Sequence, residues 1–195
     1  MIDMNHAATM GVASLTVGGA FRRIGLNSRD TVVISAAAGG IGSIAVQYAV
    51  AKGATVIGIA SKKNSEYLKS LGAIPVAYEE NIQNALLSAS PKPITKFLDC
   101  YGRDYVKLAF SLGLKGTDIG TLVPSPYVMI RGAQFTGPRH STYDDLNTLA
   151  EMVSEGKVWL NIDQVYDFSL KSVREAYRSL KSGHTRGKKV VKVRG

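Results

Sequence analysis

The chain has one cysteine and no long hydrophobic run, and both shortages exclude classes of protein. Cys100 is the single cysteine among 195 residues, so an internal disulfide framework and a cysteine-rich zinc site are excluded. The longest weakly polar run, residues 36–51, is interrupted by glycine, serine and glutamine and is too short to span a bilayer. The N-terminus has no basic stretch before an apolar core, which a secretion signal would need. We therefore expect a cytoplasmic protein that has no contact with membranes.

Acidic residues are scarce at the C-terminal end. Residues 171–195 hold nine Lys or Arg residues and one acid, Glu175, so +8 of the formal net charge of +9 lies there. A basic surface of this kind is typical of proteins that bind nucleic acid or another acidic surface. However, lysines alternate with valines in the last residues as in an ordinary strand, and no nucleic-acid motif accompanies them. Binding of an acidic partner is therefore kept only as an alternative.

The remaining composition predicts one packed α/β domain. Hydrophobic residues make up 45% of the chain and charged residues 20%, which excludes intrinsic disorder. Short β-branched runs alternate with helical stretches, so we expect a Rossmann-type, doubly wound parallel sheet of about six strands with helices on both faces. The expected strands are residues 31–35, 55–59, 75–78, 95–99, 119–123 and 134–136. The expected helices are residues 40–52, 65–71, 81–90, 105–113 and 141–155.

The pattern changes after Gly156. A strand is expected at residues 164–168, a helix at 169–180 and a second strand at 188–193. We therefore divide the chain into a dinucleotide-binding domain, residues 1–160, and a C-terminal strand–helix–strand segment, residues 161–195.

A glycine-rich turn between the first strand and the first helix predicts a site for a pyrophosphate. Glycine lets the backbone approach the phosphates closely, and the N–H groups at the helix start stabilise their charge. The dinucleotide fingerprint would place glycines at positions 37, 39 and 42, and Ala37 stands at the first of them. The alternative is a turn that serves only tight packing of helix on strand. The predicted pyrophosphate residues are Gly39, Gly40, Ile41 and Gly42.

No acid follows the second strand until Glu66. A site selective for NAD would place Asp or Glu near the end of this strand to bind the ribose 2′-hydroxyl. The residues there carry a hydroxyl, two ammonium groups and an amide, which are donors suited to a 2′-phosphate. They are Ser61, Lys62, Lys63 and Asn64. We therefore expect NADP(H) as the cofactor, with ordinary solvated lysines as the alternative.

Four segments together resemble a known family. They are residues 36–47 around the glycine turn, residues 60–73, residues 97–102 with the sequence Phe-Leu-Asp-Cys-Tyr-Gly, and residues 182–191 in the tail. The set resembles the cofactor-binding half of the medium-chain dehydrogenase/reductase superfamily, in its zinc-independent, quinone oxidoreductase-like branch. The resemblance covers nearly the whole chain, and residues 7–16 look like the helix that precedes the first cofactor strand.

The resemblance implies an arrangement of domains and a set of cofactor contacts. A catalytic domain would precede the nucleotide-binding domain and is absent here, and the chain would return to it through residues 161–195. The resemblance places the 2′-phosphate at Ser61, Lys62 and Asn64, and the adenosine near Tyr78. It places the nicotinamide ribose near Cys100, Leu122 and Val123. Two residues depart from the family pattern: Tyr101 replaces a smaller apolar residue, and Asn64 stands where some relatives have Lys.

The resemblance also implies a reaction, in which a hydride passes from the reduced nicotinamide to a quinone or an α,β-unsaturated carbonyl. No metal is expected, because His6, His140 and His184 show no ligand spacing among themselves. The catalytic residues are left open. Arg139, His140 and Tyr143 could face a substrate, but a polar loop and a helix cap are the favoured explanation for all three.

Two further expectations remain open. The chain could be an NADP(H)-binding module without turnover. A homodimer could also form through the sheet edge at residues 134–136, because an unpaired edge strand favours pairing with another copy.

Overall fold

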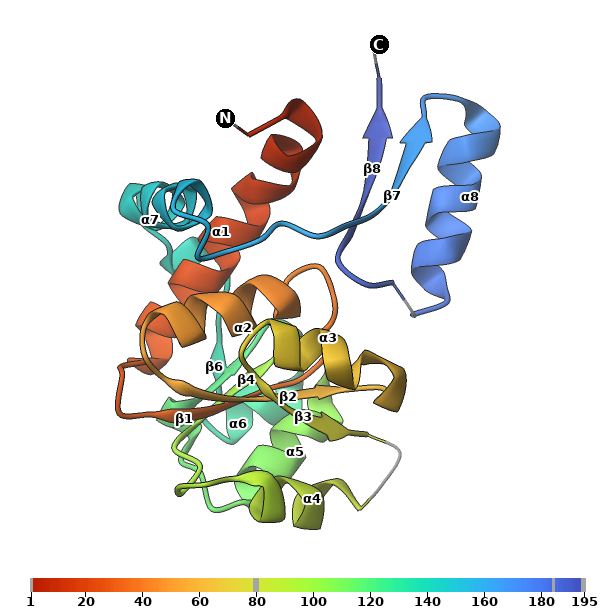
Figure 1. Cartoon of the computed structure of the whole chain (residues 1–195). Coiled ribbons are helices and arrows are strands. Elements are labelled where there is room, and N and C mark those ends of the chain that lie inside the picture. The colour runs from red at the N-terminus through yellow and green to blue at the C-terminus, as the bar shows by residue number, and fades with distance from the viewer. Residues whose placement is uncertain (1, 79–80, 184, 194–195) are drawn as a thin grey trace.

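The central element is a parallel sheet of six strands, seen in a computed structural model that describes residues 2–78, 81–183 and 185–193 (Figure 1). The strand order is β3-β2-β1-β4-β5-β6, and every neighbouring pair is parallel. This is the order of the dinucleotide-binding doubly wound fold, and it confirms the predicted fold class. The strands are β1 (Thr31–Ile34), β2 (Thr55–Ala60), β3 (Ile74–Ala77), β4 (Lys96–Asp99), β5 (Ile119–Thr121) and β6 (Gln134–Phe135).

Helices cover both faces of this sheet, and the alternation of side chains along β1 explains why. Val32 and Ile34 point into one hydrophobic core, and Val33 points into a second core on the opposite face. A strand that is buried on both faces needs a cover on each. The first core receives α1 (Met4–Ile24), α2 (Gly42–Ala51), α3 (Ser65–Ser70) and α7 (Tyr143–Ser154). The second receives α4 (Ile82–Ala89), α5 (Arg103–Ser111) and α6 (Pro126–Ile130), on the other side of the sheet in Figure 1.

The helix α1 is longer than the sequence pattern predicts. Its N-terminus is capped by Asp3, whose carboxylate accepts from the N–H groups of Asn5 and His6 at 2.9 and 3.1 Å. Near its other end, both terminal nitrogens of Arg22 donate to the buried carboxylate of Asp145 at 2.6 Å each. This fork holds α1 against α7 and stabilises a helix whose glycine-containing sequence is a poor helix former by itself.

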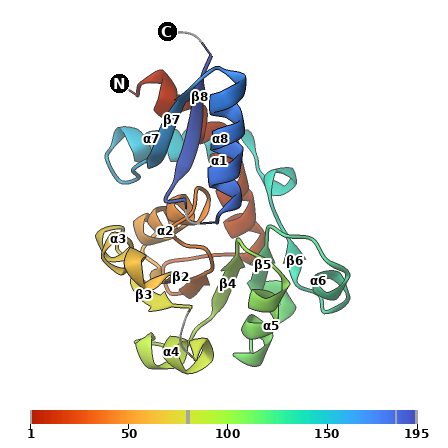
Figure 2. The same ribbon diagram turned by 90° about the vertical axis from the view of Figure 1, so that its right-hand side faces the viewer.

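The C-terminal residues form a separate two-stranded parallel sheet, β7 (Ile162–Asp167) and β8 (Lys188–Lys192), joined by α8 (Leu170–Lys181). The expected strand–helix–strand segment is therefore present, while the domain boundary at residue 160 remains a prediction. Figures 1 and 2 place this unit beside α1, on the α2 side of the main sheet. It returns to the glycine turn, where the Gly187 N–H donates to the Ala38 carbonyl at 3.0 Å.

In the described part of the chain, no helix has both the length and the hydropathy that a membrane span requires.

Candidate functional site

The turn between β1 and α2 is built from very close backbone contacts. The Gly39 N–H donates to the Ala36 carbonyl at 2.9 Å, and the Gly39 carbonyl accepts from Ser43 at 2.9 Å. A Cβ added at Gly42 would lie 2.2 Å from the Ala36 carbonyl oxygen, so only glycine fits there. Ala36 itself has φ +47°, a left-handed conformation that is strained for alanine. The turn is thus specified both by packing and by local strain.

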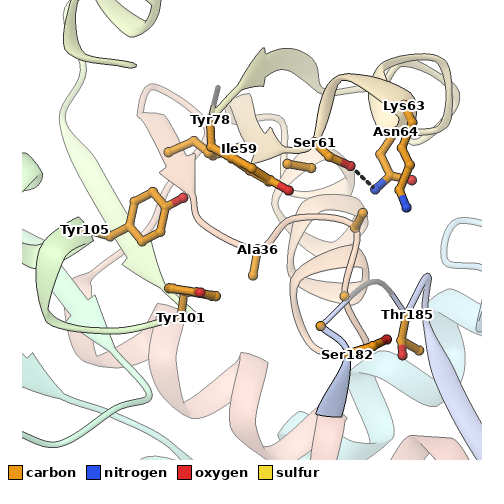
Figure 3. Close-up of a pocket in the computed structure, with 14 residues that line it drawn as sticks. Ala36, Ile59, Ser61, Lys63, Asn64, Tyr78, Tyr101, Tyr105, Ser182 and Thr185 are labelled. Atoms are coloured by element: carbon orange, nitrogen blue, oxygen red, sulfur yellow. Dashed lines mark hydrogen bonds between the residues drawn. The ribbon is translucent and has the colours of Figure 1, made fainter. Parts of the chain in front are cut away.

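A cavity of about 320 Å³ opens at the carboxyl ends of the strands beside this turn. β1 lies between β2 and β4, where the order of strands reverses, and ligands of open α/β sheets bind at this position. Figure 3 shows the labelled side chains around the cavity, with tyrosines on one side and polar residues on the other. The lining comes from the glycine turn (Ala36, Ala38, Gly39), the end of β2 and its loop (Ile59, Ala60, Ser61, Lys63, Asn64), three tyrosines (Tyr78, Tyr101, Tyr105) and the segment after α8 (Ser182, Gly183, Thr185).

Four of the predicted site residues line this cavity, namely Gly39, Ser61, Asn64 and Tyr78. They come from three separate loops, which the parallel strands bring to one edge of the sheet. The predicted residues Gly40, Ile41, Gly42, Lys62, Cys100, Leu122 and Val123 are not in the cavity wall. The neighbouring lysine, Lys63, lines it where Lys62 was the residue selected from the sequence.

Gly40 is covered by the C-terminal segment. A Cβ at this position would lie 2.8 Å from Cγ of Lys188 and 3.0 Å from the Gly187 carbonyl oxygen. The extra glycine of the turn therefore makes room for the tail, a role that the local sequence does not reveal.

Cys100, Leu122 and Val123 lie directly after β4 and β5, at the same sheet edge as the cavity. The buried carboxylate of Asp99 organises this edge, because it accepts hydrogen bonds from Ser35 Oγ and Thr121 Oγ1 at 2.7 Å each. It also accepts from the backbone N–H groups of residues 101 and 102 at 2.9 and 3.0 Å. Burial raises the pKa of the Cys100 thiol, and the nearby Asp99 charge raises it further. Cys100 is half-buried and packs against the first core, so it is a packing residue whose thiol resists ionisation.

The polar side of the cavity is held together by hydrogen bonds between side chains. The Asn64 amide nitrogen donates to Ser61 Oγ at 3.1 Å, and the Asn64 backbone N–H donates to the Ser61 carbonyl at 2.8 Å. The Asn64 amide oxygen accepts from the Arg186 guanidinium through Nε at 3.2 Å and Nη2 at 3.0 Å. Among the described residues that line the cavity, none is Asp or Glu.

Two parts of the cavity wall were not predicted from the sequence. Tyr101 and Tyr105 pack edge to face with ring centroids 5.6 Å apart, and the Tyr101 side chain is 73% exposed. Thr185 comes from the tail, and its hydroxyl is buried with no hydrogen-bond partner. A buried, unpaired hydroxyl in a cavity wall is a group that a polar ligand would satisfy. The departure of Tyr101 from the family pattern was a signal for the tyrosine pair. Nothing in the sequence around residue 185 indicates that Thr185 belongs to the wall.

The residues proposed as possible substrate contacts lie elsewhere. The His140 carbonyl accepts from Arg22 at 3.2 Å, and the Arg139 guanidinium lies 5.3 Å from the Phe135 ring centre. Tyr143 is 77% exposed at the start of α7. None of the three lines the described cavity, and their role as substrate contacts stays a hypothesis.

Comparison with known proteins identifies the family. The family described as zinc-binding dehydrogenase matches residues 71–191 of this sequence. The chain belongs to this family. Its resemblance to quinone oxidoreductase-like members of the medium-chain dehydrogenase/reductases is thereby confirmed.

Several relatives among known proteins are longer than this chain. The mitochondrial NAD(P)H oxidoreductase RTN4IP1 of Bos taurus is 29% identical over 223 residues, which cover 96% of this chain and 55% of the relative. The chloroplastic quinone-oxidoreductase QR1 of Triphysaria versicolor is 32% identical over 210 residues, which cover 97% and 62%. The solved quinone oxidoreductase of Coxiella burnetii has a TM-score of 0.81 at 33% identity, over 96% of this chain and 60% of that one. The chain thus spans less than two thirds of these proteins.

The family's description as zinc-binding does not by itself establish a zinc site in this chain. Within the described ranges, no three His, Cys, Asp or Glu side chains are grouped closely enough to hold a metal ion. His184, one of the three histidines considered in the sequence, lies outside the described residues. Independence from zinc therefore remains a prediction.

Proposed function

We propose that this chain binds NADP(H) in the cavity beside β1, where the order of the strands reverses, and is the nucleotide-binding part of an oxidoreductase. The observation that carries the proposal is the chemistry of the polar wall. It presents a hydroxyl at Ser61, an ammonium at Lys63 and an amide at Asn64, and the described residues of the lining include no carboxylate. Such donors stabilise a 2′-phosphate, whereas a 2′-hydroxyl is usually bound by an acid.

The cofactor would lie along the carboxyl edge of the sheet. Gly39 and the start of α2, through Gly42, would face the pyrophosphate, and α2 has no side-chain cap that would compete for its N–H groups. The adenosine would sit in the cavity near Tyr78. The nicotinamide end would point toward Cys100, Leu122 and Val123, after β4 and β5. The unpaired Thr185 hydroxyl supports the fit, because a phosphate or ribose oxygen would satisfy it.

A bound nicotinamide would supply the hydride, and the acceptor would be a quinone or an α,β-unsaturated carbonyl. The Triphysaria versicolor and Coxiella burnetii relatives are named quinone oxidoreductases, and the Bos taurus relative is named an NAD(P)H oxidoreductase. These names support the substrate class. The residues of this chain would contribute by holding and orienting the cofactor and by excluding water from it.

The 2′-phosphate assignment is tested by a variant with reversed charge. Replacing Ser61→Asp and Lys63→Gly, two residues of the cavity wall, should weaken NADPH binding about tenfold and improve NADH binding, measured by nucleotide fluorescence. Unchanged NADPH affinity would show that the 2′-phosphate binds elsewhere. Steady-state turnover of a quinone by the 195-residue chain then distinguishes an enzyme from a binding module without turnover.

The basic C-terminal end has internal roles that disfavour nucleic acid as its ligand. Lys189 Nζ pairs with Asp163 at 2.5 Å, and the Lys188 stem packs on the glycine turn at Gly40. These contacts use two of the basic residues within the fold. Binding of a random DNA duplex that weakens steeply with salt would restore the alternative.

Assembly and location remain proposals as well. β6 is the edge strand of the sheet, as the dimer hypothesis requires, and size-exclusion chromatography of the chain tests whether two copies pair there. The cytoplasmic location rests on the sequence alone, and two of the named relatives are mitochondrial and chloroplastic.

A further inference from the structure

Arg186 lies where the C-terminal segment meets the loop after β2. Its guanidinium donates twice to the Asn64 amide oxygen, at 3.0 and 3.2 Å, and lies 4.9 Å from the centre of the Tyr67 ring. Asn64 in turn donates to Ser61 Oγ at 3.1 Å. A cation from the end of the chain therefore lies beside the cavity, bonded to Asn64 of its wall, although Arg186 is not itself a lining residue.

The backbone beside Arg186 is fixed from two directions. The Arg186 carbonyl accepts from the Asn161 amide at 2.8 Å, and the next N–H, of Gly187, donates to the Ala38 carbonyl at 3.0 Å. A Cβ at Gly187 would lie 2.3 Å from the Asn161 carbonyl oxygen, so the segment passes through a gap that admits only glycine. The position of Arg186 relative to the glycine turn is thus set by the fold.

The present hydrogen-bond partner of Arg186 is a neutral group that a charged ligand would replace. The guanidinium is exposed and bonds to a neutral amide oxygen, and within the described residues no carboxylate forms an ion pair with it. A phosphate offers the same fork of nitrogens two charged oxygens, which gives shorter and stronger hydrogen bonds. The neighbouring Thr185 hydroxyl, buried in the cavity wall and unpaired, independently indicates that this segment faces a polar ligand.

We propose that Arg186 is a specificity-determining residue that binds the 2′-phosphate of NADP(H), with Asn64 as the residue that positions it. The inference rests on the proposed function and deepens it. Recognition of the phosphate is then divided between the loop after β2 and the segment that enters β8, and the C-terminal unit becomes part of the nucleotide site.

The test compares three variants of the full 195-residue chain by calorimetry with NADPH and with NADH. Arg186→Gln should lower the affinity for NADPH about tenfold and change the affinity for NADH less than about twofold, because only NADPH carries the 2′-phosphate. Arg186→Lys keeps the charge but loses the forked pair of nitrogens, so its affinity for NADPH should lie between those of the unsubstituted chain and Arg186→Gln. Arg174→Gln removes the same charge from the exposed surface of α8 and should leave both affinities unchanged. Titration with 2′,5′-ADP and with 5′-AMP repeats the comparison without the nicotinamide.

The outcomes separate the inference from the function on which it rests. Suppose that the unsubstituted chain binds NADPH. If Arg186→Gln then lowers the affinities for NADPH and NADH equally, or lowers neither affinity, the inference is wrong and the proposed function stands. If the unsubstituted chain binds neither nucleotide, the proposed function and the inference fail together. A loss of NADPH affinity that Arg174→Gln reproduces would assign the effect to general charge and would also contradict the role of Arg186.

Discussion

The hydroxyl of Ser35 donates a 2.7 Å hydrogen bond to the fully buried carboxylate of Asp99, and so joins the ends of β1 and β4 at the switch point. The same carboxylate receives the Thr121 hydroxyl from β5 at 2.7 Å. One side chain thus holds together three strand ends on which the proposed nicotinamide contacts depend.

Two substitutions at Asp99 should lower the free energy of unfolding by clearly different amounts. Asp99→Ala leaves the hydroxyls of Ser35 and Thr121 and two backbone N–H groups without an acceptor, so it should cost ~3 kcal/mol or more. Asp99→Asn keeps one oxygen for Ser35 and the N–H groups, and the Thr121 hydroxyl can turn toward the Val123 carbonyl, 3.3 Å away. Its cost should be ~1 kcal/mol. Urea denaturation measures both, and equal costs would show that Asp99 does not organise the edge.

Two glycines of α1 provide a matched pair. A Cβ at Gly11 meets nothing within 4 Å, whereas a Cβ at Gly18 would lie 2.5 Å from the Asp145 side chain. Gly11→Ala should therefore stabilise the protein by ~1 kcal/mol through helix propensity. Gly18→Ala should destabilise it, because α7 must move and the fork between Arg22 and Asp145 is distorted. Thermal unfolding that changes in the same direction for both variants would contradict the close packing of α1 on α7.

Thr185→Val should separate stability from binding. The Thr185 hydroxyl is buried without a partner, so replacement by a methyl group of similar shape should stabilise the ligand-free protein by ~1 kcal/mol. The same change should weaken both NADPH and NADH, about fivefold each, if the hydroxyl binds a group that the two nucleotides share. Thr9→Val is the control, since the Thr9 hydroxyl already donates within α1 at 2.8 Å. Unchanged affinity for both nucleotides would mean that the Thr185 hydroxyl does not contact the cofactor.

Cys100 should resist alkylation. Burial and the neighbouring Asp99 charge raise the pKa of its thiol, so little thiolate is present at pH 8, where an ordinary cysteine reacts readily. Labelling with iodoacetamide should be slow in the native protein and fast in urea. Rapid native labelling at pH 8 would contradict the assignment of Cys100 as a packing residue.

The local pattern predicted the sheet well, because buried parallel strands are continuous β-branched runs and Thr31–Ile34 is one of them. It also predicted the glycine turn, because Gly42 is required by contact with Ala36, only a few residues away in the sequence. It missed α6, a five-residue helix with Pro126 at its start, which is too short to show a period. It also underestimated α1, whose glycines disfavour a helix until Asp145 of α7 pairs with Arg22.

The C-terminal contribution to the cavity could not be predicted from the sequence. The hydrogen bond from Gly187 to Ala38 joins segments from opposite ends of the chain, and neither composition nor periodicity reveals such pairs. For the same reason the sequence selected Ser61 and Asn64 as residues near a phosphate, but not Arg186, which bonds to Asn64.

The central claim is that this chain binds NADP(H) through its 2′-phosphate, and the most direct measurement is a calorimetric titration of the unsubstituted chain with NADPH and with NADH. The account predicts that NADPH binds at least about tenfold more tightly, as expected for charge-assisted hydrogen bonds to one additional phosphate. Equal affinities, or tighter binding of NADH, would contradict it.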